Sequence, residues 1–209
     1  MPPTKEMTLF WPGKITYKLI FMSTYFGQAQ DTDGRVTTSG IGLASISLVG
    51  FREVYKYGLP ELILEDKHTF KFCTLLGIVL LKLIAWDDRS EARRDDIKDI
   101  SDILHRFFDM YAEIIYENHN DLFENHNDNL AYIAAQVLGR EIKKIADRNP
   151  ILHQRINRIL TENTDAFENS RIGQIMTEYF ENTIADNVLL LRQLKQGFEA
   201  RPHPKNSLK

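Results

Sequence analysis

The stretch "LLGIVLLKLIAWDDR" (residues 75–89) decides how this chain folds. Lys82 is the only charged residue between Leu75 and Trp86, and no face of a helix through these positions is polar. Burying an unpaired ammonium costs on the order of several kcal/mol. The lysine must therefore extend to an edge of its helix, pair with a buried acid or face a cleft. Lysines are rarely fully buried unless they are paired, so a position at the helix edge or an ion pair with an acid is favoured. The functional alternative is a lysine that faces phosphate.

Bulk composition sets limits on the class of protein. The chain has 209 residues, of which 43% are hydrophobic and 26% charged, enough for one large domain or two small ones. Its net charge of -3 gives no global basic field for nucleic acid or anionic membrane, although local basic patches stay open. The single Cys73 excludes an internal disulfide and a cysteine-based zinc site, and fits a reducing compartment. Without a signal-peptide pattern or a run long enough to span a bilayer, we expect a cytoplasmic protein with no membrane association.

The residue composition and periodicity of the sequence change near residue 73. Before it, short runs rich in β-branched and aromatic residues are typical of strands and turns. We expect strand at 14–26, an Asp-Gly turn at 30–35, extended chain at 36–49, one or two helical turns at 50–58 and a hairpin at 61–72. After residue 73, apolar residues recur at helical spacing up to Leu194. The fold class that follows is α+β and predominantly α, with a helical bundle in the C-terminal part.

Helix starts can be placed from local chemistry. Thr74 is expected to cap a helix that runs to about Trp86, and Ser90 to cap the next one. Pro150 suits the first turn of a later helix. We expect a domain division into residues 1–88, an α/β region, residues 89–198, a helical bundle, and residues 199–209, a flexible tail.

A short repeat, "ENHND", occurs at residues 117–121 and again at 124–128. On one continuous helix, His119 and His126 would lie two turns apart on one face, which makes a metal site conceivable. Asparagine favours turns and caps over helix interiors, and the spacing fixes no third ligand. We therefore interpret the repeat as a solvated helix end and connector.

Clustered carboxylates follow the apolar helix in "RRDDIKDISD" (residues 93–102). Helical spacing places Asp95, Asp99 and Asp102 on one face, with Asp96 three residues before Asp99. Such a cluster can hold a divalent metal, or it can pair with the basic residues beside it. Spacing alone favours the solvated or ion-paired interpretation.

Two blocks of this sequence resemble a known family. "GFREVYKYG" (50–58), a hairpin and "LLGIVLLKLIAWDDRSEARRDDIKDISDIL" (75–104) resemble the C-terminal half of nucleotidyltransferases of the AbiEii/AbiGii toxin family. "AAQVLGREIKKI" (134–145) is similar to a Leu-Gly-Arg helix of the same family, and the resemblance covers roughly residues 26–145. The matching residues are Gly50, Phe51, Arg52, Glu53, Gly77, Leu81, Lys82, Leu83, Ala85, Trp86, Arg89, Arg94, Asp96, Asp99 and Ile100.

The resemblance implies a small mixed nucleotidyltransferase-like sheet, here a remnant, followed by helices. It implies that Lys82 and Arg89 face the phosphates of a nucleotide. It also implies that Asp96 and Asp99 organise the second helix near that cleft and anchor Lys82 or Arg89.

The carboxylates that the family's chemistry needs do not appear in this chain. Nucleotidyl transfer resembles two-metal phosphoryl transfer, in which acids hold Mg²⁺. Aligning Phe26-Gly27 with the family pattern puts Met22 at the position of the third acid, and no acid lies between Met7 and Gln30. A thioether does not replace a carboxylate toward Mg²⁺. We therefore expect no complete catalytic set, and Mg²⁺ only if other residues complete the site.

"DTD" (31–33) resembles an Asp-x-Asp motif but is better explained as part of a turn, because a glycine follows it. The expected function is a nucleotidyltransferase-like protein of the AbiEii type, truncated or degenerate and inactive as the chain stands. The alternative is a non-catalytic helical interaction module or phosphate-binding protein that self-associates through its incomplete sheet. The partners in question are a nucleoside triphosphate, an antitoxin-type protein or a second copy; no DNA-binding motif is present.

Overall fold

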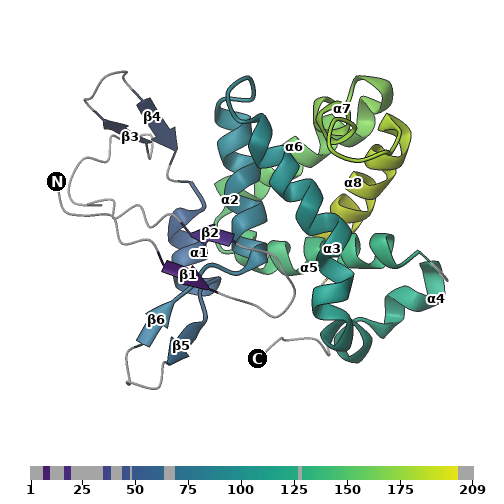
Figure 1. Ribbon diagram of the computed structural model, residues 1–209, viewed down its shortest axis with the longest axis horizontal. Coiled ribbons are helices and arrows are strands. Elements are labelled where there is room, and N and C mark those ends of the chain that lie inside the picture. The colour runs from purple at the N-terminus through teal and green to yellow at the C-terminus, as the bar shows by residue number, and fades with distance from the viewer. Residues whose placement is uncertain are drawn as a thin grey trace.

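A computed structural model shows a mostly helical protein (Figure 1). It describes residues 7–9, 17–19, 35–38, 44–47, 49–63, 69–126 and 129–201. The helices are α1 (Phe51–Tyr57), α2 (Leu75–Asp88), α3 (Arg94–Asn118), α4 (Phe123–His126), α5 (Leu130–Ala146), α6 (Pro150–Asp165), α7 (Arg171–Met176) and α8 (Ile184–Glu199). Short 3-10 turns, η1 (Asn120–Leu122) and η2 (Phe167–Asn169), join some of them.

The described strands form separate antiparallel pairs rather than one sheet. They are β1 (Met7–Leu9) with β2 (Tyr17–Leu19), β3 (Arg35–Thr38) with β4 (Ala44–Ser47), and β5 (Glu61–Ile63) with β6 (Thr69–Lys71). The β5–β6 register pairs Glu61 with Lys71, which confirms a hairpin-like pairing in 61–72. Of the turn expected at 30–35, only Arg35 is described, and it begins β3. The Asp31–Asp33 motif and Met22 lie outside the described residues.

The apolar helix forms where the sequence predicts it. Thr74 precedes α2, and its hydroxyl accepts a hydrogen bond from the Gly77 backbone N–H. Because the sequence offers no polar face, α2 is covered by several neighbours: it packs against α3, α5 and α6 (Figure 1). Its buried side chains belong to one continuous core that extends through α8. Among the described residues, no helix combines the length and apolarity needed to cross a bilayer.

The predicted cap at Ser90 is wrong. The chain turns after Arg89, α3 begins only at Arg94, and the Ser90 hydroxyl bonds the Glu91 carboxylate instead. Asp95 and Asp96 occupy the first turn of α3, where negative side chains interact favourably with the helix dipole. These acids stabilise the helix start in place of a hydroxyl cap.

The later helices follow the predicted stripes with one interruption. Asn149 caps α6 through its side chain, and Pro150 occupies the first turn as expected. The apolar residues from Ile172 to Leu194, which recur at helical spacing in the sequence, do not lie on one helix, because α7 ends at Met176 and α8 begins at Ile184. Thr183 and Asp186 form a reciprocal capping box at the start of α8, which fixes this break.

The "ENHND" connector is not solvated at its first copy. His119 is buried, and its Nε2 lies 3.4 Å from Glu141 Oε1 on α5. Burial alone would raise the pKa of Glu141, but contacts with His119 and Lys144 outweigh burial and lower it. The connector is therefore held to α5 by buried polar contacts.

The two histidines of the repeat do not share one helix. Helix α3 ends at Asn118, so His119 and His126 are separated by η1 and a helix start. Arg140 of α5 binds Asp121 with two hydrogen bonds of 2.9 and 2.6 Å. The repeat thus contributes an anchor between α3 and α5, as a connector, rather than a paired-histidine face.

Helices α5 and α8 cross with their backbones in close approach. A Cβ added at Gly139 would lie 2.1 Å from the Leu194 carbonyl oxygen, and one added at Gly197 would lie 2.0 Å from that of Gln136. Real side chains do not tolerate such distances, so this crossing requires glycine on both helices. Beside it, the buried amide of Gln136 donates to Gln193 at 2.6 Å.

The variant Gly139→Ala should lower the free energy of unfolding by about 3 kcal/mol or prevent folding, because the helices must move apart. Chemical denaturation followed by circular dichroism measures it. The matched control is Gly173→Ala on α7, where the nearest contact of an added Cβ is the Ser170 side chain at 3.0 Å. We expect that control to stay within about 1 kcal/mol of the parent. Equal effects at both positions would contradict the close crossing.

Candidate functional site

The ammonium of Lys82 pairs with two carboxylates of the following helix. Its Nζ lies 2.8 Å from Asp96 Oδ1 and 2.6 Å from Asp99 Oδ2. The Lys82 side chain is 25% exposed, so the group lies between α2 and α3 near their surface. Of the three alternatives drawn from the sequence, pairing with an acid is the one observed.

The two carboxylates differ in environment. The Asp96 side chain is 7% exposed and also accepts a hydrogen bond from Arg93 Nε at 2.6 Å. The Asp99 side chain is 47% exposed, and its contact with Lys82 is its only ion pair among the described residues. Asp96 is therefore a fixed partner held from two sides, whereas Asp99 is a partner that solvent or a ligand can replace.

Lys82 stays charged in this setting. Burial by itself lowers the pKa of Lys82, but hydrogen bonds and charge from Asp96 and Asp99 outweigh burial and raise it above the ordinary value. An ammonium has three N–H donors, and these two carboxylates use two of them. One donor remains for a further oxygen.

Arg89 does not join this cluster. It follows the last turn of α2, where its backbone N–H donates to the Trp86 carbonyl at 3.2 Å. Its side chain is exposed and forms no ion pair within the described part of the chain. The structure therefore brings together Lys82, Asp96 and Asp99 of the predicted site and leaves Arg89 apart.

The cluster does not fit a metal ion. The Lys82 ammonium already binds one oxygen of Asp96 and one of Asp99, and the cation and a metal would compete for them. In the described ranges, no group of three or more His, Cys, Asp or Glu side chains is placed to hold a metal. Asp96 and Asp99 thus act toward the lysine, and we derive no metal-dependent step from them.

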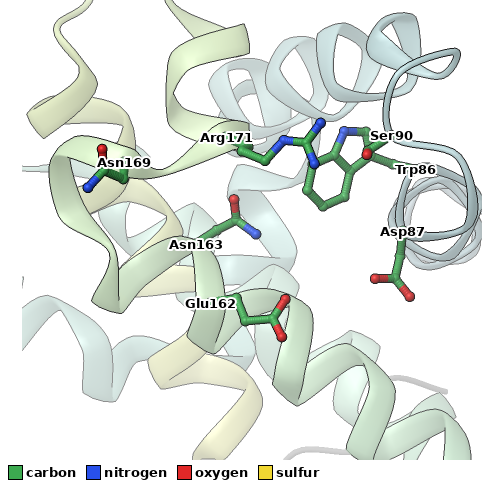
Figure 2. Close-up of a pocket in the computed structure, with 7 residues that line it drawn as sticks. All are labelled: Trp86, Asp87, Ser90, Glu162, Asn163, Asn169 and Arg171. Atoms are coloured by element: carbon green, nitrogen blue, oxygen red, sulfur yellow. The ribbon is translucent and has the colours of Figure 1, made fainter.

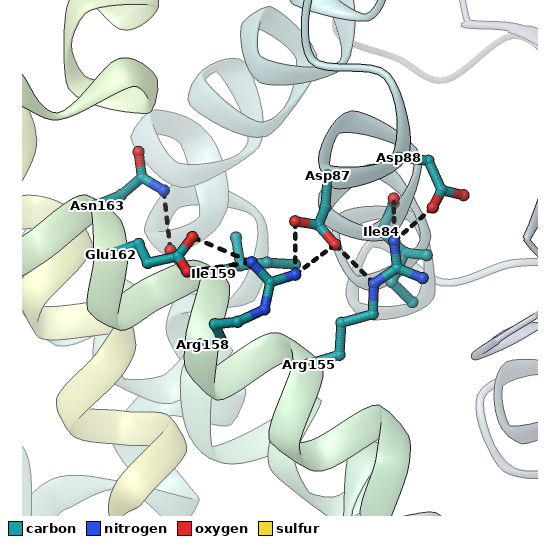
Figure 3. A network of polar contacts seen from close by, with 8 residues as sticks. All are labelled: Ile84, Asp87, Asp88, Arg155, Arg158, Ile159, Glu162 and Asn163. Atoms are coloured by element: carbon teal, nitrogen blue, oxygen red, sulfur yellow. Dashed lines mark hydrogen bonds and ion pairs between the residues drawn. The ribbon is translucent and has the colours of Figure 1, made fainter.

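The acids that end α2 form a separate network with α6 (Figure 3). Asp87 binds Arg155 at 2.7 Å and Arg158 at 2.8 Å. Arg155 also donates to Asp88 at 2.6 Å and to the Ile84 carbonyl at 3.3 Å. Carboxylates at a helix C-terminus oppose the helix dipole, and the guanidinium of Arg155 offsets both the acids and the open carbonyl.

Sequence reasoning missed Arg155 and Arg158. The signal was present, because two acids at a helix end need cations and these arginines lie three residues apart on one helix face. The sequence separation from Asp87, 68 and 71 residues, hid the pairing.

A polar pocket of about 230 Å³ opens beside this network (Figure 2). It is lined by Trp86, Asp87, Ser90, Glu162, Asn163, Asn169 and Arg171. Its carboxylates are already bound, since both Asp87 and Glu162 accept from Arg158. The amide of Asn163 is likewise satisfied by backbone groups of Ile159 and Ile172. Neither Lys82 and Arg89, predicted to face phosphate, nor the supporting carboxylates Asp96 and Asp99 line this pocket.

Comparisons add no relative to this geometry: no family model, no curated protein and no solved structure matches the chain.

The variant Asp96→Asn should lower the free energy of unfolding by about 2 kcal/mol, because Lys82 and Arg93 each lose a charged partner at a buried position. The variant Asp99→Asn should cost under about 1 kcal/mol, since exposed ion pairs contribute little. Urea denaturation of both variants gives the comparison. A larger loss for Asp99→Asn than for Asp96→Asn would contradict the assignment of fixed and exchangeable partners.

Proposed function

We propose that this protein is nucleotidyltransferase-like, of the AbiEii/AbiGii toxin type, and that it binds the phosphates of a nucleoside triphosphate at Lys82 without transferring the nucleotide. The observation that carries the proposal is the contact of Lys82 with both Asp96 and Asp99 across α2 and α3. These are the lysine and the two acids that the family resemblance selects in the sequence. Their meeting at one point supports a shared role.

Phosphate binding at this point proceeds by exchange of one partner. A phosphate oxygen accepts a hydrogen bond from the third N–H of the Lys82 ammonium, which Asp96 and Asp99 leave unused. Repulsion between the phosphate and Asp99 then moves this exposed carboxylate into solvent, and Asp96, held also by Arg93, keeps the ammonium in place. Lys82 acts as a point charge and a donor, which is the way lysine commonly binds phosphate.

Binding without transfer follows from the residues present. Catalysis needs oxygen ligands for Mg²⁺, and Met22 stands where the resemblance places the third acid. Asp96 and Asp99 serve Lys82 instead. The proposed site therefore keeps Lys82 for phosphate but has no acid where the resemblance places the third metal ligand.

A second candidate is an interaction module that self-associates through its strands. It is favoured by the described strands forming two-stranded pairs, because each strand of such a pair has one edge without a strand neighbour among the described residues. Light scattering distinguishes this candidate, because it requires a dimer or larger species that nucleotide does not change.

The proposed function is tested by titrating the protein with nucleoside triphosphates in a calorimeter, with and without Mg²⁺. We expect binding that Lys82→Met abolishes. Asp99→Asn should tighten it by about fivefold, because the competing carboxylate loses its charge. The control is Lys98→Met, whose ammonium lies on the same helix as Asp99 but bonds Asp102 at 3.5 Å.

That control should bind nucleotide as the parent does. The proposal fails if no triphosphate binds the parent, or if Lys82→Met and Lys98→Met weaken binding equally. A monitored conversion of triphosphate to nucleotidylated product by the purified chain would contradict the non-catalytic part of the proposal.

A further inference from the structure

The surface around α1 combines two exposed tyrosines of this helix with cations from α1, β6 and the turn between α5 and α6. Tyr55 is 61% exposed and Tyr57 is 55% exposed. The basic residues of this surface are Arg52, Lys56, Lys71 and Arg148, all of them exposed. Helix α1 and the β5–β6 pair lie at one edge of the molecule, beside the helical bundle (Figure 1). We call these six residues the tyrosine–cation surface.

The cations of this surface differ from most others in the protein. None of the four forms an ion pair with a carboxylate within the described ranges. Elsewhere, ion pairs engage Lys82, Arg93, Arg94, Lys98, Arg140, Lys143, Lys144, Arg155, Arg158, Arg171 and Lys195. Most of the described lysines and arginines of the bundle are thus paired with acids, whereas these four, which lie close together around α1, are not.

The acids near this surface do not cancel its charge. Glu53 is buried on the inner side of α1, where it accepts a hydrogen bond from Asn149. Glu61, the cross-strand neighbour of Lys71, is the exposed acid in the described parts of 51–63 and 69–72. Asp147, which precedes Arg148, is engaged by Lys143 and His153. The local balance is positive although the whole chain carries a net charge of -3. A positive patch on an acidic protein points to a specific anionic partner rather than to general attraction.

Two of the cations lie over tyrosine rings. Lys71 Nζ is 5.0 Å from the centroid of the Tyr55 ring, and Arg148 Cζ is 5.0 Å from that of the Tyr57 ring. Each ring therefore has a cation against it while more than half of the residue stays exposed. On α1, Arg52 and Lys56 are four residues apart and share the outer face with Tyr55.

From this arrangement we infer that the tyrosine–cation surface binds single-stranded nucleic acid. Bases stack on the exposed tyrosine rings, and backbone phosphates contact the four cations. An acidic peptide would use the cations and have no need of the rings. A single strand uses both kinds of group in alternation, because each nucleotide offers one π-face and one phosphate. The inference does not depend on nucleotide binding at Lys82.

The test is fluorescence anisotropy with a labelled oligouridylate of about 15 nucleotides, titrated with the full chain at several salt concentrations. Tyr55→Ala should weaken binding by about tenfold, and Tyr55→Phe should stay within about twofold, because phenylalanine keeps the stacking face. Arg52→Gln should reduce the slope of log affinity against log salt by about 0.7, the contribution of one phosphate contact.

The matched control is Arg106→Gln, which removes an exposed arginine on α3 that has no ion pair in the described part of the chain. It should leave affinity and salt slope unchanged, and so should Lys82→Met. The inference is overturned if the oligonucleotide does not bind at low salt, or if Tyr55→Ala binds as the parent does. Equal competition by poly-glutamate, or binding to phosphatidylserine vesicles in place of the oligonucleotide, would overturn it as well.

Discussion

An ammonium on an otherwise apolar helix must find its counter-charge on a neighbouring element, and the structure around α2 is arranged by this constraint. Lys82 extends to α3 and binds Asp96 and Asp99 there. At its end, α2 carries two acids that need cations, and Arg155 of α6 supplies one. The few charges of this apolar helix thus help to orient it, because ion pairs and hydrogen bonds are directional whereas apolar contacts are not.

The remaining helices complete the core around α2 by close packing. The crossing of α5 and α8 at Gly139 and Gly197 brings two backbones together. The buried His119, which lies beside Glu141, and the half-buried Asp121, which binds Arg140, then fix the end of α3 to α5. The candidate phosphate site lies at the α2–α3 corner and the tyrosine–cation surface at the edge formed by α1 and β6. The two sites use different residues and can act separately.

Local chemistry made much of this fold predictable. Thr74, Pro150 and the helical spacing of apolar residues locate α2, α5 and α6, and the need of Lys82 for an acid follows from its surroundings. Contacts across many residues were not predictable in the same way: the pairing of Asp87 with Arg155 spans 68 residues. The prediction of a cap at Ser90 was wrong because α3 begins four residues later, without a side-chain cap and with acids in its first turn that interact favourably with the helix dipole. The connecting role of "ENHND" was predicted, but not the burial of His119.

The pairing of Lys82 is tested most directly by an NMR titration of its side-chain Nζ and Cε resonances. We predict a pKa above the ordinary lysine value, since Asp96 and Asp99 outweigh burial. A pKa raised by folding means that the pair stabilises the protein fully below the unfolded pKa and ceases to do so as the pH rises through the folded pKa. We therefore predict that Lys82 titrates above the ordinary pH for a lysine, and that Asp96→Asn lowers its pKa. A Lys82 that titrates at or below the ordinary value would contradict it.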